Sequence, residues 1–290
     1  MVTSHKCAKV AINKVQCRES KKIIFDFGAN EGQNLQYFIK NSDLVIAVEP
    51  NPKLAKLIND RFSSEILDGN LVVENVAPVD EKPSGLVDFY INKNVHVNSH
   101  LDKPAKPEKY LKISVMGVLP SDLVKKYLKS GDVLHYIKID LEGYDAKVLS
   151  NLFRNKIYPN FISAEFQSVD VFAQLVLSGK YNAFKLGDKV KKTYDYTALG
   201  LVPSGRFGTD LPGEWLGIDS FFYFLAMNGD KGIDIHASLL DSPNILIGSK
   251  YSPKNPKYLF DRLIVIIFKN IFRFFEEQMR RILRFLRKCL

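Results

Sequence analysis

The sequence has few cysteines and no long apolar stretch. Its three cysteines, Cys7, Cys17 and Cys289, are odd in number and far apart. They lack the spacing of a disulfide framework or a metal site, which favours a reducing compartment, so we expect a cytoplasmic protein. No run of about 18 apolar residues occurs, which argues against a membrane-spanning helix. Residues 1–22 contain no apolar run either, and we expect no secretory signal peptide there.

Positive charge is concentrated at one end of the chain. Residues 258–290 hold eight basic and three acidic side chains, a net charge of +5. Subtracting this from the total of +9 leaves only +4 for residues 1–257. A mildly basic body attracts a phosphate backbone weakly, so we expect no DNA partner and treat RNA as an alternative. The composition leaves the oligomeric state open.

Residues 23–34, IIFDFGANEGQN, have the pattern of a buried strand that turns sharply into a helix. Asp26 would be costly to bury without partners, which favours a role in a site over a structural one. Gly28 and Gly32 remove side chains where a ligand would approach the backbone. Free N–H groups at the start of the helix favour an electron-rich partner. The spacing D-x-G-x-N-x-G, which includes Asn30, differs from the G-x-G-x-x-G of dinucleotide enzymes.

A second apolar strand pattern, residues 44–48, ends in Glu49, Pro50 and Asn51. In dinucleotide-binding folds, an acid about 20 residues beyond the glycine turn binds a ribose diol. Glu49 lies 21 residues after Gly28. We therefore predict that the turn and this acid together bind a nucleoside.

Strand and helix patterns alternate over most of the remaining chain, which predicts βαβ units and a mostly parallel sheet. Two polar segments, residues 92–109 and 187–218, are predicted to be loops, and long loops in such folds often cover sites. Further strands are predicted at 71–76, 86–91, 113–118, 133–139, 161–166, 183–186 and 220–226, and helices at 33–40, 53–62, 120–128, 144–153 and 169–177.

Two more acids follow the strand pattern of residues 133–139. Asp140 and Glu142 are two positions apart in an extended segment, so their side chains should lie on the same side of it. Open α/β sheets bind ligands at the carboxyl ends of their strands. The pair could share a proton or hold a divalent ion, but we expect no metal because no further ligand set is visible.

Four blocks of the sequence resemble the FkbM family of S-adenosylmethionine-dependent methyltransferases. They are FDFGANEG, AVEPNP, NVA and YIKIDLEG, which begin at Phe25, Ala47, Asn75 and Tyr136. The last block is the most specific, and the resemblance covers roughly residues 20–226. It implies an α/β, Rossmann-like class I methyltransferase fold, with a mostly parallel seven-stranded sheet and helices on both faces. It also implies S-adenosylmethionine as cofactor and methyl transfer to a hydroxyl oxygen.

The resemblance implies roles for individual residues. Asp140 and Glu142 would lie beside the methyl group. An O-methyltransferase must also remove a hydroxyl proton, and His100 in the polar loop is a third candidate for catalysis, against the alternative of a solvated loop histidine. The positions implied to bind the cofactor are Asp26, Gly28, Asn30, Gly32, Glu49, Asn51 and Ala77.

Four other residues have both a functional and a structural interpretation. Lys138 could stabilise an acceptor oxyanion or simply line the strand edge. Trp215 could stack on a sugar ring or pack in the core. Arg206 could bind an acidic acceptor or be a solvated loop residue, and the same loop interpretation applies to His96.

Residues 258–290 have the pattern of a basic amphipathic helix. At 100° per residue, the apolar residues from Ile264 onward fall on one face, and the basic residues from Lys269 to Lys288 fall on the opposite face. This pattern favours a helix that lies on an anionic membrane surface. The alternative is a helix that packs onto the body or onto a second subunit.

These observations predict four segments: a polar lead-in at 1–19, a methyltransferase domain at 20–235, an irregular linker at 236–257 and the amphipathic helix at 258–290. The predicted function is methyl transfer to a hydroxyl of a small-molecule or lipid-linked glycan. The alternatives are an RNA methyltransferase and a nucleotide-binding interaction protein that has lost catalysis. The expected location is cytoplasmic, with the membrane surface as a peripheral site.

Overall fold

The computed structural model describes residues 19–81, 85–94, 99–187, 205–211, 215–228 and 233–239. The predicted amphipathic helix and His96 lie outside these ranges. No helix within the described ranges is long and apolar enough to cross a membrane.

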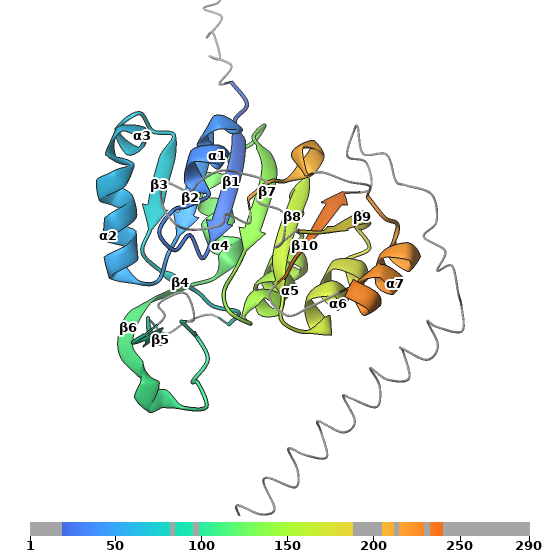
Figure 1. Cartoon of the computed structure of the whole chain (residues 1–290). Coiled ribbons are helices and arrows are strands. Elements are labelled where there is room, and N and C mark those ends of the chain that lie inside the picture. The colour runs from blue at the N-terminus through green and yellow to red at the C-terminus, as the bar shows by residue number, and fades with distance from the viewer. Residues whose placement is uncertain are drawn as a thin grey trace, which may run out of the picture.

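A seven-stranded sheet forms the centre of the molecule, in the order β3-β2-β1-β7-β8-β10-β9 (Figure 1). Strands β3, β2, β1, β7 and β8 are parallel, and β10 is antiparallel to both of its neighbours. The predicted mostly parallel, seven-stranded sheet is confirmed. The strands are β1 (Lys22–Phe27), β2 (Leu44–Val48), β3 (Leu71–Glu74), β7 (Val133–Ile139), β8 (Phe161–Phe166), β9 (Tyr181–Leu186) and β10 (Ile233–Leu239).

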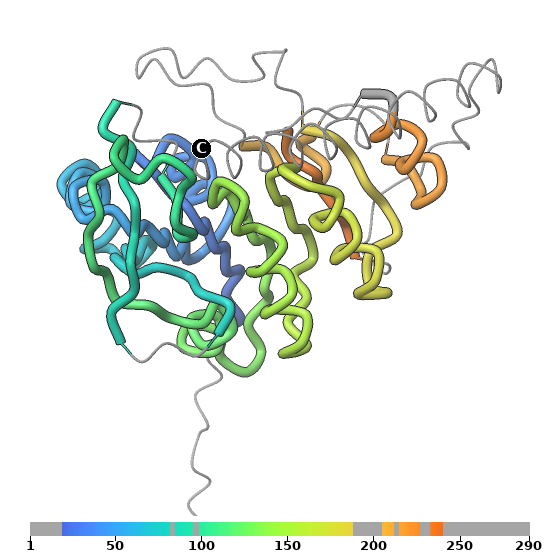
Figure 2. Tube along the Cα trace, turned by 90° about the horizontal axis from the view of Figure 1, so that it is seen from below, coloured from blue at the N-terminus to red at the C-terminus, as the bar shows by residue number. Residues whose placement is uncertain are grey.

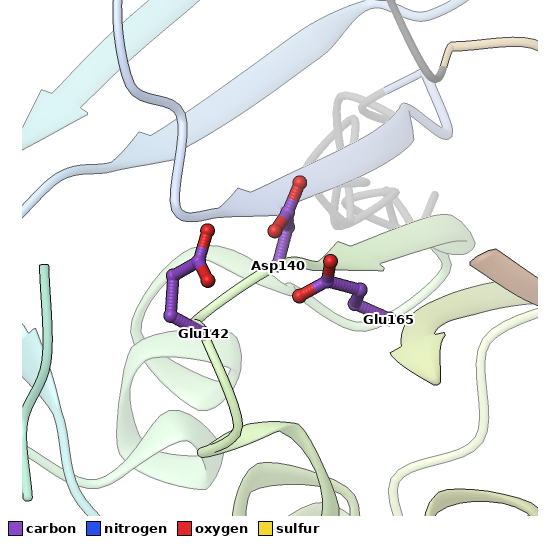
Figure 3. A group of neighbouring side chains, drawn as sticks. All are labelled: Asp140, Glu142 and Glu165. Carbon is purple, nitrogen blue, oxygen red and sulfur yellow. The ribbon is translucent and has the colours of Figure 1, made fainter. Parts of the chain in front are cut away.

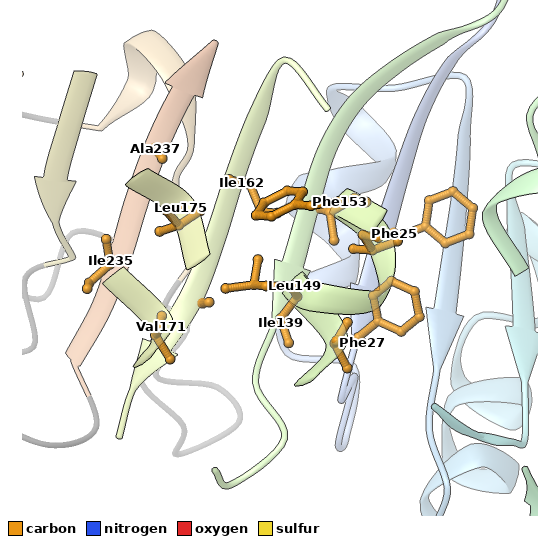
Figure 4. Close-up of a cluster of buried hydrophobic side chains, with 14 of the residues drawn as sticks. Phe25, Phe27, Ile139, Leu149, Phe153, Ile162, Val171, Leu175, Ile235 and Ala237 are labelled. Carbon is orange, nitrogen blue, oxygen red and sulfur yellow. The ribbon is translucent and has the colours of Figure 1, made fainter. Parts of the chain in front are cut away.

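Helices cover both faces of this sheet, as predicted. Helices α4 to α7 pack on one face against alternate strand residues such as Phe25 and Ile137, and Figure 4 shows part of this core. Helices α1 and α2 pack on the other face against Ile24, Val45 and Tyr136. The helices are α1 (Leu35–Lys40), α2 (Pro52–Arg61), α3 (Ser63–Leu67), α4 (Pro120–Tyr127), α5 (Asp145–Arg154), α6 (Val169–Leu177) and α7 (Ile218–Asn228), with short 3-10 turns η1 (Pro107–Lys109) and η3 (Gly208–Asp210).

A second, three-stranded sheet corrects one part of the predicted topology. Strands β4 (Ala77–Pro78), β5 (Leu86–Asn92) and β6 (Tyr110–Val118) form a separate sheet in the order β4-β6-β5. Strands β5 and β6 are antiparallel, because no crossover helix separates them. Figures 1 and 2 show this small sheet beside the end of the main sheet at which the parallel strands terminate.

The end of the domain also differs from the prediction. The segment predicted as a last strand, residues 220–226, lies within helix α7. Phe221 and Leu225, four positions apart, face the core, whereas Phe222 is exposed, which is a helical pattern that a short apolar run conceals. The last strand is β10, which runs to Leu239 and so extends past the predicted domain boundary at residue 235. The rest of the four-segment division stays a prediction.

Candidate active site

A pocket of about 240 Å³ lies where β1, β2 and β7 end. This position is the switch point of the sheet, because the chain leaves β1 towards β2 on one side and returns to β7 on the other. The small sheet and its loop close the pocket from the opposite side through Phe89, Ser99 and Leu101. The remaining lining residues are Gly28, Asn30, Gln33, Glu49, Pro50, Asn51, Leu54, Asp140, Leu141 and Glu142.

The two glycines of the first turn are needed mainly for contacts within the protein. Gly28 has a φ of +90°, and a Cβ there would lie 2.0 Å from the carbonyl oxygen of Asp140. Glycine thus lets the turn after β1 contact the end of β7, while its backbone lines the pocket. Gly32, with a φ of +75°, packs against the side chains of Leu35 and Phe62 and does not line the pocket. Close packing, rather than ligand approach, therefore explains Gly32.

Glu49 is held rigidly by the backbone on both sides of the pocket. Its Oε2 accepts a 2.8 Å hydrogen bond from the Asn30 amide, and its Oε1 accepts one of 2.8 Å from the Asn51 amide. Asn30 adopts a φ of +51°, and Asn51 caps helix α2 by accepting from the Lys53 amide. Burial raises the pKa of Glu49 to about 7, against the opposing effect of these two hydrogen bonds. The structure thus brings Asn30, Glu49 and Asn51 together as predicted.

The turn after β1, residues 28–33, lies beside Glu49 and presents hydrogen-bond acceptors that lack donors among the described residues. The side-chain oxygens of Asn30 and Gln33, both residues of the pocket lining, are buried without a hydrogen-bond partner among the described residues. Buried acceptors of this kind require a donor. The ammonium and ribose hydroxyl groups of S-adenosylmethionine are donors, and its sulfonium is a cation, so the residues present fit this cofactor.

Asp26 lies below the pocket rather than in its lining. Its carboxylate is fully buried, and Asp26 pairs in register with Lys138 on the neighbouring strand. Burial raises the pKa of Asp26 to about 6, although Lys138 opposes the shift. The structure therefore places Asp26 within the sheet beside Lys138 and outside the pocket lining, so it does not bring Asp26 to the surface where the resemblance implied contact with the cofactor.

Lys138 connects this buried acid to the pocket. Its ammonium, on a side chain that is 1% exposed, donates a 2.8 Å hydrogen bond to Oδ2 of Asp140. Burial lowers the pKa of Lys138, but the nearby charges of Asp140, Asp26 and Asp234 outweigh burial and raise it. Lys138 is therefore a charged lysine that orients the Asp140 carboxylate.

Three carboxylates converge beside the pocket: those of Asp140, Glu142 and Glu165, whose facing oxygens all lie within 4.8 Å of one another (Figure 3). Burial, followed by the charges of Glu165 and Asp140, raises the pKa of Glu142 to about 8. Glu142 adopts a φ of +52°, which for a residue other than glycine is a strained conformation typical of functional sites. Among the described residues, this group alone has the proximity that a metal ion would require.

Sequence reasoning missed Glu165. It stands near the end of β8, and the pairing of Ile139 with Ala164 places it next to Asp140. The signal was available in principle, because adjacent parallel strands end at the same edge of a sheet. Buried Asp145 supports the arrangement by accepting backbone hydrogen bonds from Leu141 and Glu165.

Other predicted residues lie away from the carboxylates. His100 forms an isolated β-bridge with Tyr90, and its ring lies 5.5 Å from that of Tyr110, while its neighbours Ser99 and Leu101 line the pocket. Alternation along this extended segment turns the His100 side chain away from the pocket, so the structure does not bring this candidate base together with Asp140. Ala77 is buried in β4 and is absent from the lining.

The predicted alternatives for Trp215 and Lys138 are also decided by contacts. Trp215 is 5% exposed and packs against the ring of Phe161, with the Lys185 ammonium 4.8 Å from its own ring centre. It therefore belongs to the core and cannot stack on a sugar in this structure. Lys138 has more than a strand-edge role, because it is paired with Asp140.

Comparison with known proteins identifies the domain. The family model described as "Methyltransferase FkbM domain" matches residues 26–192. A methyltransferase FkbM structure from Methylobacillus flagellatus aligns at 13% identity and a TM-score of 0.40, over 79% of this chain and 46% of that one. An rRNA methylase from Streptococcus thermophilus aligns at 8% identity and a TM-score of 0.37, over 77% and 89%. A SAM-dependent O-methyltransferase from Thermotoga maritima aligns at 8% identity and a TM-score of 0.34, over 80% of this chain and 62% of that one.

The alignment thus spans less than half of the Methylobacillus protein. No curated protein matches the chain.

Proposed function

The chain belongs to the FkbM methyltransferase family, and we propose that it transfers a methyl group from S-adenosylmethionine to a hydroxyl oxygen of a saccharide or glycolipid. The observation that carries this proposal is the single pocket that joins the turn at Gly28, the backbone-held Glu49 and the Lys138-paired Asp140. The cofactor supplies a methyl group already activated on a sulfonium. The chain must therefore supply chiefly binding, alignment and removal of the acceptor proton.

The residues divide into two groups by these tasks. Glu49 would hold the ribose hydroxyls of the cofactor, and the buried oxygens of Asn30 and Gln33 would accept hydrogen bonds from its amino-acid end. Asp140 would take up the proton of the acceptor's hydroxyl group. Lys138 holds the Asp140 carboxylate in position for this transfer.

The alternative of RNA as the acceptor finds little support in the charge of the site. None of the described residues that line the pocket is basic, whereas proteins that bind RNA contact its phosphates with lysine and arginine. The other alternative, a binding protein without chemistry, predicts cofactor binding without turnover.

One assay separates these functions. Full-length protein is titrated with S-adenosylmethionine by calorimetry, and S-adenosylhomocysteine release is then measured with a panel of sugars, glycolipids and small RNAs, with added magnesium or with chelator. We expect cofactor binding and turnover with hydroxyl-bearing glycans. Binding without any turnover would favour the interaction protein, and turnover with RNA alone would favour the second alternative.

The sequence of residues 258–290 adds a proposal about location. Its separated apolar and basic faces suit an anionic membrane surface and would bring the domain to a lipid-linked acceptor. We expect full-length protein to float with anionic vesicles, less so at high salt, whereas a chain ending at Lys257 should not float. If the truncation instead changes only the mass of the protein in solution, the segment mediates a protein contact and the membrane proposal is wrong.

A further inference from the structure

We propose that Glu142 and Glu165 determine acceptor specificity: they bind two neighbouring hydroxyl groups of an uncharged sugar and exclude acceptors that carry a phosphate or carboxylate beside the reacting hydroxyl. This inference rests on the proposed function, because it assumes transfer to a hydroxyl. It deepens that function by naming the chemical class of the acceptor and by assigning a role to Glu165.

The first support is the charge of the site. Among the described residues, the lining contains three acids, Glu49, Asp140 and Glu142, and no lysine, arginine or histidine. The nearby cation Lys138 is almost fully buried and already paired with Asp140. An anionic group that entered here would face these carboxylates, and no described residue of the lining would offer it a cation. Even in water, a carboxylate about 4 Å from a bound anion weakens the binding of that anion about fivefold, and this repulsion grows as solvent is excluded.

The second support is the position of Glu165. The cofactor pocket is built on β1, β2 and β7, and Glu165 extends the group of carboxylates from β7 onto β8. The loop that carries Ser99 and Leu101 also borders the pocket, and it is anchored to α5 because Lys147 donates 3.0 Å hydrogen bonds to both carboxylate oxygens of Asp102. In this proposal the acceptor binds at the β8 end of the group of carboxylates, beside Glu142 and Glu165.

The third support is the hydrogen-bonding capacity of the two glutamates. No described residue donates a hydrogen bond to the Glu142 carboxylate. Glu165 accepts one from the Gln167 amide at 2.7 Å, and a carboxylate can accept several more. A hydroxyl lies about 2.7 Å from the oxygen to which it donates, so donors can fit between two carboxylates whose oxygens lie within 4.8 Å of each other.

The number of donors favours a diol. One hydroxyl carries one proton and can satisfy only one of the two glutamates, whereas a vicinal diol supplies one donor to each. An amine would also bind, but nearby carboxylates favour its ammonium form, which has no lone pair with which to attack a methyl group. A diol is therefore the acceptor that both binds here and remains reactive.

The experiment compares matched acceptors. Methyl hexopyranosides are tested beside their uronate analogues and beside monodeoxy analogues that lack one neighbouring hydroxyl. Relative kcat/KM is measured with full-length protein at pH 8.5, because the pKa of Glu142 is raised to about 8 and its carboxyl is ionised above that value. Sugar binding is measured at the same pH by calorimetry in the presence of saturating S-adenosylhomocysteine. The variants are Glu165→Gln and Glu142→Gln. The control is Glu108→Gln, which removes the same charge from an exposed position on η1.

We expect the wild-type protein to prefer a neutral sugar over its uronate by at least about tenfold and over its deoxy analogue by about tenfold. Glu165→Gln should reduce the neutral-to-uronate ratio about fivefold and weaken binding of the neutral sugar, while cofactor affinity stays the same. Glu142→Gln should act in the same direction. Glu108→Gln should leave the ratio at its wild-type value.

Three results would overturn the inference while leaving methyl transfer to a hydroxyl intact. The first is equal or better use of uronates, and the second is an unchanged ratio in both glutamine variants. The third is turnover that chelator abolishes and magnesium restores, which would assign the carboxylates to a metal ion. If no hydroxyl acceptor is methylated although the cofactor binds, the proposed function itself fails, and this inference fails with it.

Discussion

Glu49 and Glu142 line one pocket but follow strands on opposite sides of β1, namely β2 and β7, and they differ in how their carboxylates are satisfied. We call the surroundings of Glu49 the cofactor wall and those of Glu142 the acceptor wall. Both oxygens of Glu49 accept backbone hydrogen bonds from residues of two neighbouring turns. The Glu142 carboxylate accepts none from any described residue and lies close to two other acids. The cofactor wall is therefore preorganised by the chain, while the acceptor wall keeps unfavourable charge that a ligand must relieve.

This difference follows from where each glutamate lies in the fold. Glu49 follows a central parallel strand, where the turns after β1 and β2 direct the N–H groups of Asn30 and Asn51 at its carboxylate. Glu142 follows β7 in a strained turn, where the nearest polar neighbours are Asp140 and Glu165. Substitutions on the cofactor wall should therefore affect stability more than equivalent substitutions on the acceptor wall. Matched pairs of variants, one on each wall, can test this difference.

The largest difference should come from glycines on the two walls. Gly28→Ala would push a Cβ into the Asp140 carbonyl at a φ of +90°, whereas nothing lies within 4 Å of a Cβ at Gly143, which has a φ of +98°. We expect Gly28→Ala to cost about 3 kcal/mol or more and Gly143→Ala about 1–2 kcal/mol. Thermal unfolding measures both, and equal losses would show that the β1–β7 contact is not the reason for Gly28.

Asp140 lies between the two walls and should control turnover rather than binding. Asp140→Asn keeps the shape of the side chain but removes its ability to accept the acceptor proton, so we expect turnover to fall about 100-fold with cofactor affinity within a few-fold. His100→Ala should remain active, because its ring faces Tyr110. Single-turnover kinetics and calorimetry measure these effects. An active Asp140 variant beside an inactive His100 variant would assign the base to the loop.

Glu49→Ala should weaken cofactor binding and also destabilise the protein. The substitution leaves the amides of Asn30 and Asn51 without their acceptor, at about 1–3 kcal/mol for each buried donor. We expect the cofactor Kd to rise at least about tenfold and the unfolding temperature to fall. Glu142→Ala, which leaves no backbone donor unpaired, should produce neither effect. Similar calorimetric and thermal results for both variants would remove the distinction between the walls.

The smallest expected effect is a change in how stability depends on pH. The pKa of Glu142 rises from 4.5 to about 8 on folding, so the native state holds a proton that the unfolded state has released between these values. Stability from this group therefore falls as pH rises from about 4.5 to 8. We expect Glu142→Gln to unfold a few degrees above wild type at pH 8.5 and at the same temperature near pH 4. A constant difference across this range would contradict the raised pKa.

Much of the cofactor wall could be predicted from local sequence. The apolar strand, the turn at Gly28 and the acid 21 residues later are contiguous or regularly spaced, and short-range pattern determines their structure. Helix α2 is a clear case: the sequence predicts a helix at 53–62, and the structure has Pro52 in its first turn, with Asn51 as its cap. The acceptor wall was predicted less well, because its residues come from segments that only the sheet order brings together.

Two parts of the fold were predicted wrongly, the segment 220–226 and the placement of β5 and β6, and in both cases tertiary packing decided what local pattern could not. The run from Ser220 to Ala226 is apolar and aromatic, so its β-propensity is high, but tertiary packing of Phe221 and Leu225 makes it helical. Strands β5 and β6 have ordinary strand patterns, but pattern alone does not reveal to which sheet a strand belongs. His100 was misplaced because the direction of its side chain depends on the bridge to Tyr90.

By itself, the sequence determined the family, the alternation of strands and helices, and the acids that end β2 and β7, because these are set by local pattern within each segment. Only the tertiary structure decided which acids meet. Glu165 reaches Asp140 and Glu142 through the pairing of β8 with β7, and Asp26 lies beneath Lys138 through the pairing of β1 with β7. The electrostatics of the site depends on these distances between strands, and no local pattern contains them.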